Sequence, residues 1–421
     1  MKDLFLIRYN RKNIMASLAV ILLSAYAFSQ LGFSNLLPGI VNQGLLVISI
    51  MLLLLDDFIH KYRVRKDIFF PLSILMIGIT LFWNNQDVAK YGWLVQIYNV
   101  ILYIFYWISR EQNRWHKSYF KMMIGCGIFY TAGTFVCTLV PAFYNNLIYP
   151  LMRPLGYIQD YKAGFTAFYG TNGLYMCIGL CAILSYLFLN PVHKRKVIDY
   201  VISLALIVGM LLCGKRGQFI AIIFAFFVAY YFYNSNKKHG RIMKIIGISI
   251  LAVIALYFIS LFLPGVLTII ERFQEQIDKG DVSTGRFVMW GIAWLLFTQK
   301  PFVGYGWRWF RYSSYTLVDY DVHNVFLQLL VEVGIFAALP FYIFIFGNVV
   351  CAIRLLIKVR NQDNIYSNTV YIVTAVVYEV FFVALCATGT ALYQFEYMFP
   401  FFACCGLINF YSREIGRREW E

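Results

Sequence analysis

Five histidines occur in the chain, and His323 is the one whose neighbours favour chemistry. The other four lie in segments rich in Lys and Arg, whereas His323 follows Asp319 and Asp321 and precedes Asn324. An imidazole that a carboxylate orients can take a proton from a hydroxyl group near neutral pH. Asn324 is also a good N-cap for the apolar helix expected after it, so His323 could simply belong to a capping turn. The spacing leaves both interpretations open.

Two adjacent cations, Lys215 and Arg216, stand between Gly214 and Gly217 in a tight turn that joins two apolar segments. A guanidinium offers paired donors to phosphate oxygens, and the glycines allow the backbone to approach a ligand closely. Both side chains are therefore candidate ligands for an anion. The alternative is an ordinary interfacial pair whose side chains extend to water.

A third candidate cation, Arg286, comes just before the short apolar run 287–298, so it is expected near a helix N-terminus, where the dipole also favours an anion. Arg308 and Arg311 follow in the same polar segment and are individually interpreted as solvated surface charges that could extend a basic cavity. Tyr305 lies in the turn formed by residues 301–306. Its ring could stack on a sugar face, although Tyr is also common at any membrane interface.

Two carboxylates, Glu332 and Glu379, lie inside long apolar segments. Such a residue is costly in a membrane and is by default a functional hypothesis. We expect Glu332 to anchor a helix contact or an arginine of the preceding polar segment. The sequence has no phosphate-binding loop, dinucleotide fingerprint or zinc pattern, so the expected chemistry needs neither metal nor cofactor.

The elements that must position these residues are membrane helices. The 421 residues are 61% apolar and only 14% charged, a balance that is foreign to water-soluble domains. Apolar stretches long enough to cross a hydrocarbon layer of about 30 Å recur along the chain. The sequence predicts an all-α polytopic membrane protein of about twelve helices. The expected spans are 13–32, 36–55, 68–84, 91–109, 119–140, 171–189, 197–213, 218–234, 245–263, 325–350, 369–389 and 396–412.

The basic residues orient these spans. The net charge of +15 comes mainly from short loops on one side, which places both termini in the cytoplasm by the positive-inside rule. Basic stripes interleaved with exposed aromatic residues are missing, so nucleic acid is not an expected partner. Residues 1–421 are read as one membrane domain with two long outer loops, 141–170 and 264–323. Run 287–298 reaches only about 18 Å and is expected to be a surface or re-entrant helix.

An ordered set of these residues resembles the O-antigen ligase and polymerase superfamily. It consists of Gly285-Arg286, Trp290, residues 301–306, His323-Asn324, Leu327 and Glu332-Val333-Gly334. Upstream, Lys215-Arg216-Gly217 is similar to the family's outer Ser-Arg-Gly turn, and residues 164–172 to its Gly-rich approach to an Asn. The resemblance covers roughly residues 160–340. Lys215 departs from the family's small hydroxyl residue at that turn.

The resemblance implies a GT-C-like membrane glycosyltransferase whose large outer loop, 264–323, carries short helices and the catalytic groups. Arg216 and Arg286, with Lys215, would bind the diphosphate of an undecaprenyl-diphosphate-linked glycan, and His323 would activate the acceptor hydroxyl. Asn324, Asp321, Glu332 and Tyr305 would support the site. The implied setting is the bacterial cytoplasmic membrane and its lipids, with a flippase and a chain-length regulator as partner proteins.

The same residues are compatible with more than one function. The first hypothesis is a polymerase that joins repeat units of an O-antigen, capsular or exopolysaccharide glycan. A close alternative is a ligase that moves a finished glycan to a lipid, protein or wall acceptor, because the same motifs serve both. A lipid-glycan flippase or secondary transporter would suit the buried Glu332 and Glu379, but neither related halves nor broken helices are visible in the sequence. A signalling receptor gains no support from the short inner loops.

Overall fold

The computed structural model describes residues 14–30, 32, 39–60, 68–83, 86–152, 162–189, 196–234, 285–313, 321–360 and 366–418, together with residues 261, 271, 274, 275, 277, 278, 280 and 283. Every regular element in these residues is helical. The longer helices are α2 (Ile14–Ala27), α3 (Gly39–His60), α4 (Phe69–Thr80), α5 (Gln86–Ser109), α6 (His116–Leu139), α9 (Tyr169–Leu189), α10 (Val197–Cys213), α11 (Arg216–Tyr233), α14 (Arg286–Gln299), α15 (Val325–Val359), α16 (Tyr366–Thr388) and α17 (Phe395–Arg418).

The predicted all-α polytopic membrane fold is confirmed. Seven helices of the described residues are long and apolar enough to cross a membrane, and α2, α4 and α10 are shorter apolar helices. Each expected span falls on a described helix except 245–263, of which only Leu261 is described. The count of twelve spans, the single membrane domain and the orientation of the termini stay predictions.

The long polar loops contain short helical segments. The first loop begins with α7 (Pro141–Phe143), the π-helix η4 (Tyr144–Ile148) and α8 (Tyr149–Met152). The second contains α14 and the short 3-10 helix η8 (Phe310–Tyr312). With 14 residues, α14 is about 21 Å long, which is less than the roughly 30 Å of a hydrocarbon core. Its expected placement as a surface or re-entrant helix remains a prediction.

The chain forms two compact units. Unit 1 comprises residues 1–56, 114–278 and 353–378, and unit 2 comprises residues 57–113, 279–352 and 379–421. The candidate cations Lys215 and Arg216 belong to unit 1, whereas Arg286 and His323 belong to unit 2. The candidate cations are therefore divided between the two units.

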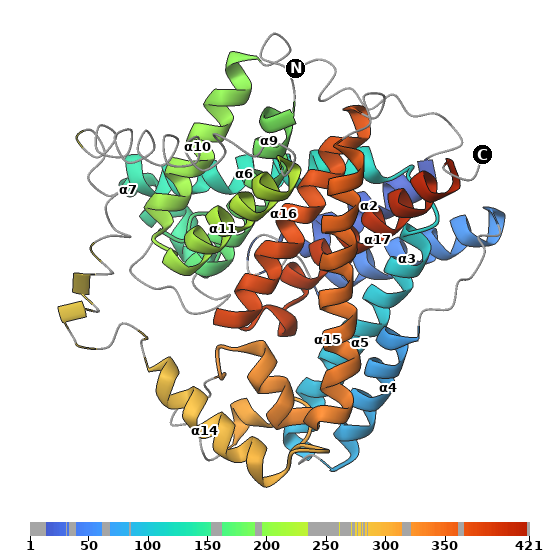
Figure 1. Ribbon diagram of the computed structural model, residues 1–421. Coiled ribbons are helices and arrows are strands. Elements are labelled where there is room, and N and C mark those ends of the chain that lie inside the picture. Colours follow the sequence, from blue (N-terminus) through green and yellow to red (C-terminus); the bar gives the residue numbers. More distant parts are fainter. Residues whose placement is uncertain are drawn as a thin grey trace. The chain divides into compact units, whose positions relative to one another are not determined.

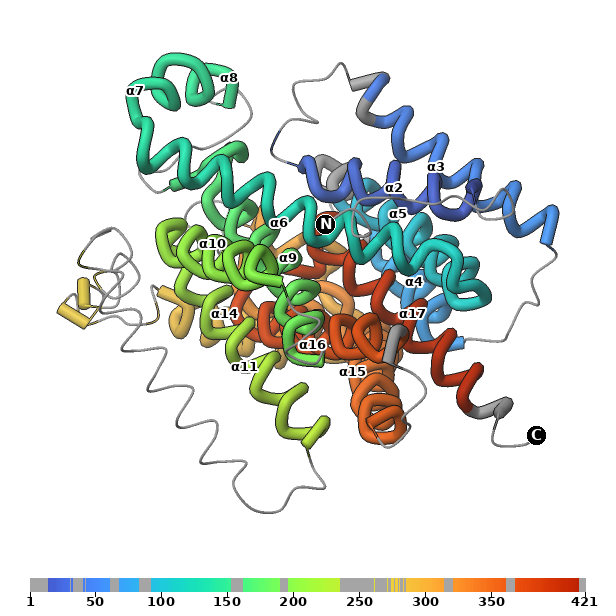
Figure 2. The backbone as a smooth tube through the Cα atoms, turned by 90° about the horizontal axis from the view of Figure 1, so that it is seen from above, coloured from blue at the N-terminus to red at the C-terminus, as the bar shows by residue number. Residues whose placement is uncertain are grey.

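In unit 1, helices α6, α9 and α10 pack against one another, with α2 on α6 and α11 on α9 (Figure 2). Two glycines allow the close approach of α6 and α9, since a Cβ built on Gly127 would lie 2.7 Å from the Cα of Gly179. Small residues at such contacts are the usual way in which membrane helices gain van der Waals packing. The Tyr130 and Tyr175 rings stack with centroids 4.4 Å apart, which joins the same two helices further.

In unit 2, α5 packs against both α4 and α17 (Figure 1). Phe70 of α4 is fully buried there, with its ring centroid 4.6 Å from that of Phe344 and 4.8 Å from that of Phe402. A second apolar cluster lies at the other end of this unit, where Ala293 and Leu296 of α14 pack with Val331 of α15. This second cluster carries the residues of the candidate site.

The outward faces of several helices are apolar. On α11, Ile220, Ile223 and Phe224 are each more than half exposed. In water such a face would be an aggregation hazard. Lipid tails solvate it without penalty because the side chains are as apolar as the tails and the helical backbone satisfies its own hydrogen bonds along the span. The exposed side chains therefore agree with the membrane assignment.

Candidate functional site

His323 lies in the turn that starts α15. Asn324 is the N-cap of that helix, since its Oδ1 accepts the Leu327 amide at 3.1 Å and its carbonyl accepts the Gln328 amide at 2.9 Å. His323 itself has φ +54°, in the left-handed region, and is half-buried. The capping role expected for Asn324 is thus present. The cap and the unusual backbone angle together fix the direction of the Cα–Cβ bond of His323.

A single side chain, that of Gln328, holds the two residues before the histidine. Its Oε1 accepts the Val322 amide at 3.1 Å, and its Nε2 donates to Asp321 Oδ1 at 3.1 Å. The same Nε2 donates to Glu332 Oε1 at 2.9 Å, one turn along α15. Gln328 is fully buried, so both ends of its amide are satisfied without water.

Glu332 is also fully buried, and it receives donors from three further residues. Its carboxylate accepts the backbone amides of Arg308 at 2.9 Å and Phe310 at 3.3 Å. The Tyr393 hydroxyl of η9 (Ala391–Tyr393) donates to it at 2.8 Å. Burial, together with the Glu332 charge, raises the pKa of Tyr393 well above its usual value, which keeps the hydroxyl protonated and able to donate. The carboxylate thus anchors the polar segment to α15.

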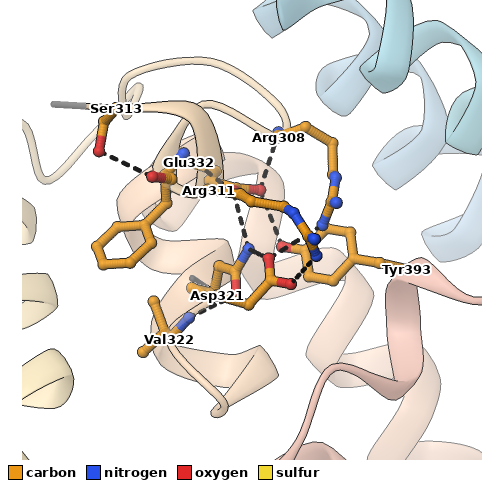
Figure 3. A network of polar contacts seen from close by, with 9 residues as sticks. Arg308, Arg311, Ser313, Asp321, Val322, Glu332 and Tyr393 are labelled. Atoms are coloured by element: carbon orange, nitrogen blue, oxygen red, sulfur yellow. Dashed lines mark hydrogen bonds and ion pairs between the residues drawn. The ribbon is translucent and has the colours of Figure 1, made fainter. Parts of the chain in front are cut away.

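Two arginines meet at Asp321 (Figure 3). An Arg308 NH group lies 3.2 Å from Oδ1 and an Arg311 NH group 2.8 Å from Oδ2. Arg308 is only 8% exposed, so its interpretation as a solvated surface charge was wrong. Burial lowers the pKa of Arg308, but the carboxylates of Asp321 and Glu332 outweigh this effect and raise it overall. Arg308 therefore stays charged and also lies over the Tyr393 ring, 4.5 Å from its centroid.

Residues 301–306 bind the backbone of α15 where that helix is broken. Gly334 has φ 69° and ψ 176° inside α15, so the helical hydrogen-bond ladder stops there. The Ile335 amide donates to the Pro301 carbonyl at 2.9 Å, and the Tyr305 and Gly306 amides donate to the Val331 and Glu332 carbonyls at 3.0 and 2.7 Å. The sequence predicted one continuous span over 325–350 and missed this break.

The two backbones can approach so closely because both positions are glycine. A Cβ on Gly304 would lie 2.4 Å from the Glu332 carbonyl oxygen, and a Cβ on Gly334 would lie 2.3 Å from the Phe302 carbonyl group. Both residues also have positive φ, which side chains other than glycine rarely adopt. The motif that the sequence showed as a glycine-rich turn is therefore a backbone clasp, formed by residues 301–306 and 331–335.

Helix α14 links Arg286 to the histidine turn. Arg286 is the first residue of the helix, as expected. One turn later, the Trp290 indole donates to the Val322 carbonyl at 3.1 Å, next to His323. Trp290 and Leu296 pack in the apolar cluster that also contains Val322. The helix that carries the candidate anion ligand is thus attached directly to the turn that carries the candidate base.

Tyr305 lies on the same cluster. Its hydroxyl donates to Gln299 Oε1 at 2.8 Å, and its ring stacks on Trp309 with centroids 4.3 Å apart and planes 19° apart. The Lys300 ammonium group lies 4.5 Å from the Tyr305 ring centroid. Both aromatic side chains remain partly exposed. The structure therefore holds Tyr305 rigidly, whereas its expected contact with a sugar stays a prediction.

In unit 1, Arg216 begins α11 and Lys215 is the N-cap of that helix, directly after Gly214, which is the C-cap of α10. The Lys215 ammonium group lies 5.5 and 4.9 Å from the ring centroids of Phe168 and Tyr169. Gln218, on the first turn of α11, donates to the Gly170 carbonyl at 2.7 Å. The turn 214–217 is therefore attached to the start of α9, so the two upstream features of the resemblance belong to one structure.

Asn172 completes that structure from inside α9. Its fully buried side chain donates to Thr134 Oγ1 at 2.9 Å and to the Lys162 carbonyl at 3.1 Å. These bonds attach the end of the first long loop to α6 and α9. Unit 1 thus holds Arg216 on a packed turn, and the expected meeting of Arg216 with Arg286 and His323 stays a prediction.

Sequence reasoning missed two residues of this site, Gln328 and Tyr393, and misassigned Arg308 as a surface charge. Gln328 had a usable signal, since it precedes Glu332 by four residues and so shares its helix face. Tyr393 had none, because it lies 61 residues from Glu332 in a short turn between two spans. Asp319, one of the two carboxylates that precede His323 in the sequence, lies outside the described residues.

Comparison with known proteins adds one finding. Residues 201–342 match the model of a protein family described as O-antigen ligase. The matched region runs from α10 through the turn at Lys215 and Arg216, α14 and the clasp to the first part of α15. No curated protein matches the chain.

Proposed function

Because the chain carries an O-antigen ligase family region at residues 201–342, we propose that it is a membrane glycosyltransferase that uses a polyprenyl-diphosphate-linked glycan as donor. The observation that supports this most strongly is that the matched region includes Arg216, Arg286 and His323, together with Asp321, Gln328 and Glu332. Tyr393, which donates to Glu332, lies outside the matched region. Lipid-linked glycans are the substrates that this family implies. A lipid-anchored donor would present its diphosphate at the depth where the polar segments leave the spans.

In the proposed reaction, the His323 imidazole takes the proton of an acceptor sugar hydroxyl. The hydroxyl oxygen then forms a bond to the anomeric carbon of the donor as the bond from that carbon to the diphosphate breaks. Negative charge develops on the leaving diphosphate, and the guanidinium groups of Arg216 and Arg286, with the Lys215 ammonium group, stabilise it. Positioned donors and a positioned base account for the catalysis, so no metal step is required in this scheme.

Polymerisation of repeat units is the first form of the proposal, and ligation of a finished glycan is the second. The family description supports glycosyl transfer of the O-antigen ligase type in general. It does not distinguish the two forms, because both use the same bond changes. A flippase is less well supported. The break in α15 at Gly334 is similar to the broken helices of transporters, but its freed backbone groups are bonded to residues 301–306.

Cells that lack the gene test the proposal and separate its forms. Loss of a polymerase should leave single repeat units on the polyprenyl carrier, whereas loss of a ligase should leave finished polymer on it. Mass spectrometry of extracted lipid-linked glycans distinguishes the two. An unchanged lipid-linked pool and surface glycan would contradict both forms, and single repeats confined to the inner leaflet would favour the flippase.

A further inference from the structure

The backbone at His323 is held in an unfavourable conformation. Among the described residues, the non-glycine positions with positive φ are Arg308 at 66° and His323 at 54°. Such angles are costly for a residue with a side chain and persist only where the surroundings impose them. Both positions border the same polar network, through the Arg308 amide on Glu332 and the Val322 amide on Gln328.

Gln328 makes three of the bonds that hold the segment around His323, two through its carboxamide and one through its backbone amide. Gln328 Oε1 accepts the amide of the residue just before His323, and Nε2 donates to the carboxylate two residues before it. On the other side of His323, the carbonyl of Asn324 accepts a hydrogen bond from the backbone amide of Gln328. The segment that carries the histidine is therefore bonded to Gln328 both before and after the imidazole.

Gln328 is itself immobilised. Its Nε2 also donates to Glu332, which accepts the Tyr393 hydroxyl and the Arg308 amide. We propose that Gln328 is the positioning residue for His323, acting through the backbone of residues 321–324. This inference rests on the proposed role of His323 as the base that activates the acceptor.

Glutamine suits this position better than residues of similar size. Leucine would leave the buried Val322 amide without its acceptor and Asp321 without one of its donors. Glutamate would keep an acceptor for Val322 but would place a second oxygen against Asp321 and Glu332, where charges repel. The Gln328 carboxamide accepts one hydrogen bond, from Val322, and donates two, to Asp321 and Glu332, so it satisfies all three neighbours.

The test compares Gln328→Leu with Gln96→Leu in purified full-length protein. Gln96 is a matched control because it is another buried glutamine of unit 2, which donates to the Ile74 carbonyl between α5 and α4. The kcat and the donor KM are measured with a polyprenyl-diphosphate oligosaccharide, and hydrogen exchange is followed in peptides that cover residues 321–324. Activities are expressed per folded protein, determined by gel filtration.

For Gln328→Leu we expect kcat to fall by about 10- to 100-fold while the donor KM changes by less than about 2-fold, because a misplaced base slows the chemical step without removing donor contacts. Exchange at residues 321–324 should accelerate. Gln96→Leu should leave both quantities unchanged. If the leucine variant does not fold, Gln328→Glu keeps the shape and should also lower kcat by about 10-fold.

Three results would overturn the inference: an unchanged kcat in the folded Gln328 variant, an equal loss in Gln96→Leu, or a rise in KM alone. His323→Ala is measured in parallel to separate this inference from the proposed function. An inactive His323→Ala with a fully active Gln328 variant would refute the positioning role alone. An active His323→Ala would refute the role of the base and the inference with it.

Discussion

At the scale of single residues, the described structure separates groups that can act on a substrate from groups that hold them. Glu332 and Asp321 are occupied by donors from their own unit, through Arg308, Gln328 and, for Glu332, Tyr393. His323 stands at the edge of this network and is half-buried. Its neighbours fix its backbone, while its imidazole is the group that we propose for proton transfer.

Replacing His323 should abolish glycosyl transfer without lowering the amount of protein in the membrane. We expect His323→Ala to lower the rate of glycosyl transfer by about 10²- to 10⁴-fold, the range for loss of a general base. The amount of inserted protein should stay unchanged, since a half-buried side chain at a helix start contributes little packing. His60→Ala, at the end of α3, is the control and should keep full activity. Quantified surface glycan in complemented cells is the measurement.

The buried carboxylate of Glu332 is expected to matter for stability. All its partners donate to it, so a carboxamide at this position would direct its NH₂ group at other donors. We predict that Glu332→Gln destabilises the protein by about 2–4 kcal/mol, which should lower the melting temperature in detergent.

Glu379→Gln provides the comparison, because Glu379 is equally buried in α16 and lies beside the Cys405 thiol. Among the described residues, no backbone amide donates to its carboxylate. Glu379→Gln should lower the free energy of unfolding by no more than about 1 kcal/mol. Equal melting temperatures for the two variants would contradict the anchoring role of Glu332.

At the scale of elements, the clasp between residues 301–306 and 331–335 positions the polar segment on α15. We predict that Gly334→Ala costs about 3 kcal/mol or more, because the added Cβ meets the Phe302 carbonyl and the backbone has positive φ. Gly347→Ala on the same helix should change the stability by less than about 1 kcal/mol, since nothing lies within 4 Å of the added atom. Gel filtration after heating measures how much of each variant stays folded. A similar loss of folded protein in Gly334→Ala and Gly347→Ala would argue against the clasp.

The helices and turns also differ in how far the sequence alone could predict them. The cap at Asn324 and the start of α14 at Arg286 were predictable, because capping and apolar periodicity are local properties. The break at Gly334 was not, since it lies in a continuous apolar run and its backbone partner is Pro301. The hydrogen bond from Tyr393 of η9 to Glu332 could not be predicted either, because contacts between distant segments leave no local sequence pattern.

At the scale of the whole molecule, the charge pattern makes a prediction about topology that the helices alone do not test. If both termini are cytoplasmic, a cysteine at position 323 should react with a membrane-impermeant thiol reagent added to intact cells. A cysteine at position 60 should react only after the cells are opened. The native cysteines are buried or partly buried, so background labelling should be low. Labelling of position 323 only from the cell interior would invert the topology.

Glycosyl transfer by the isolated protein tests the central proposal most directly. Protein purified in detergent would be given a polyprenyl-diphosphate oligosaccharide and an acceptor, with a chelator present, and the products would be weighed by mass spectrometry. We predict new glycosidic products and release of polyprenyl diphosphate from the wild type, and neither from His323→Ala. A wild-type protein that forms no product, or a His323→Ala variant that is fully active, would contradict the account.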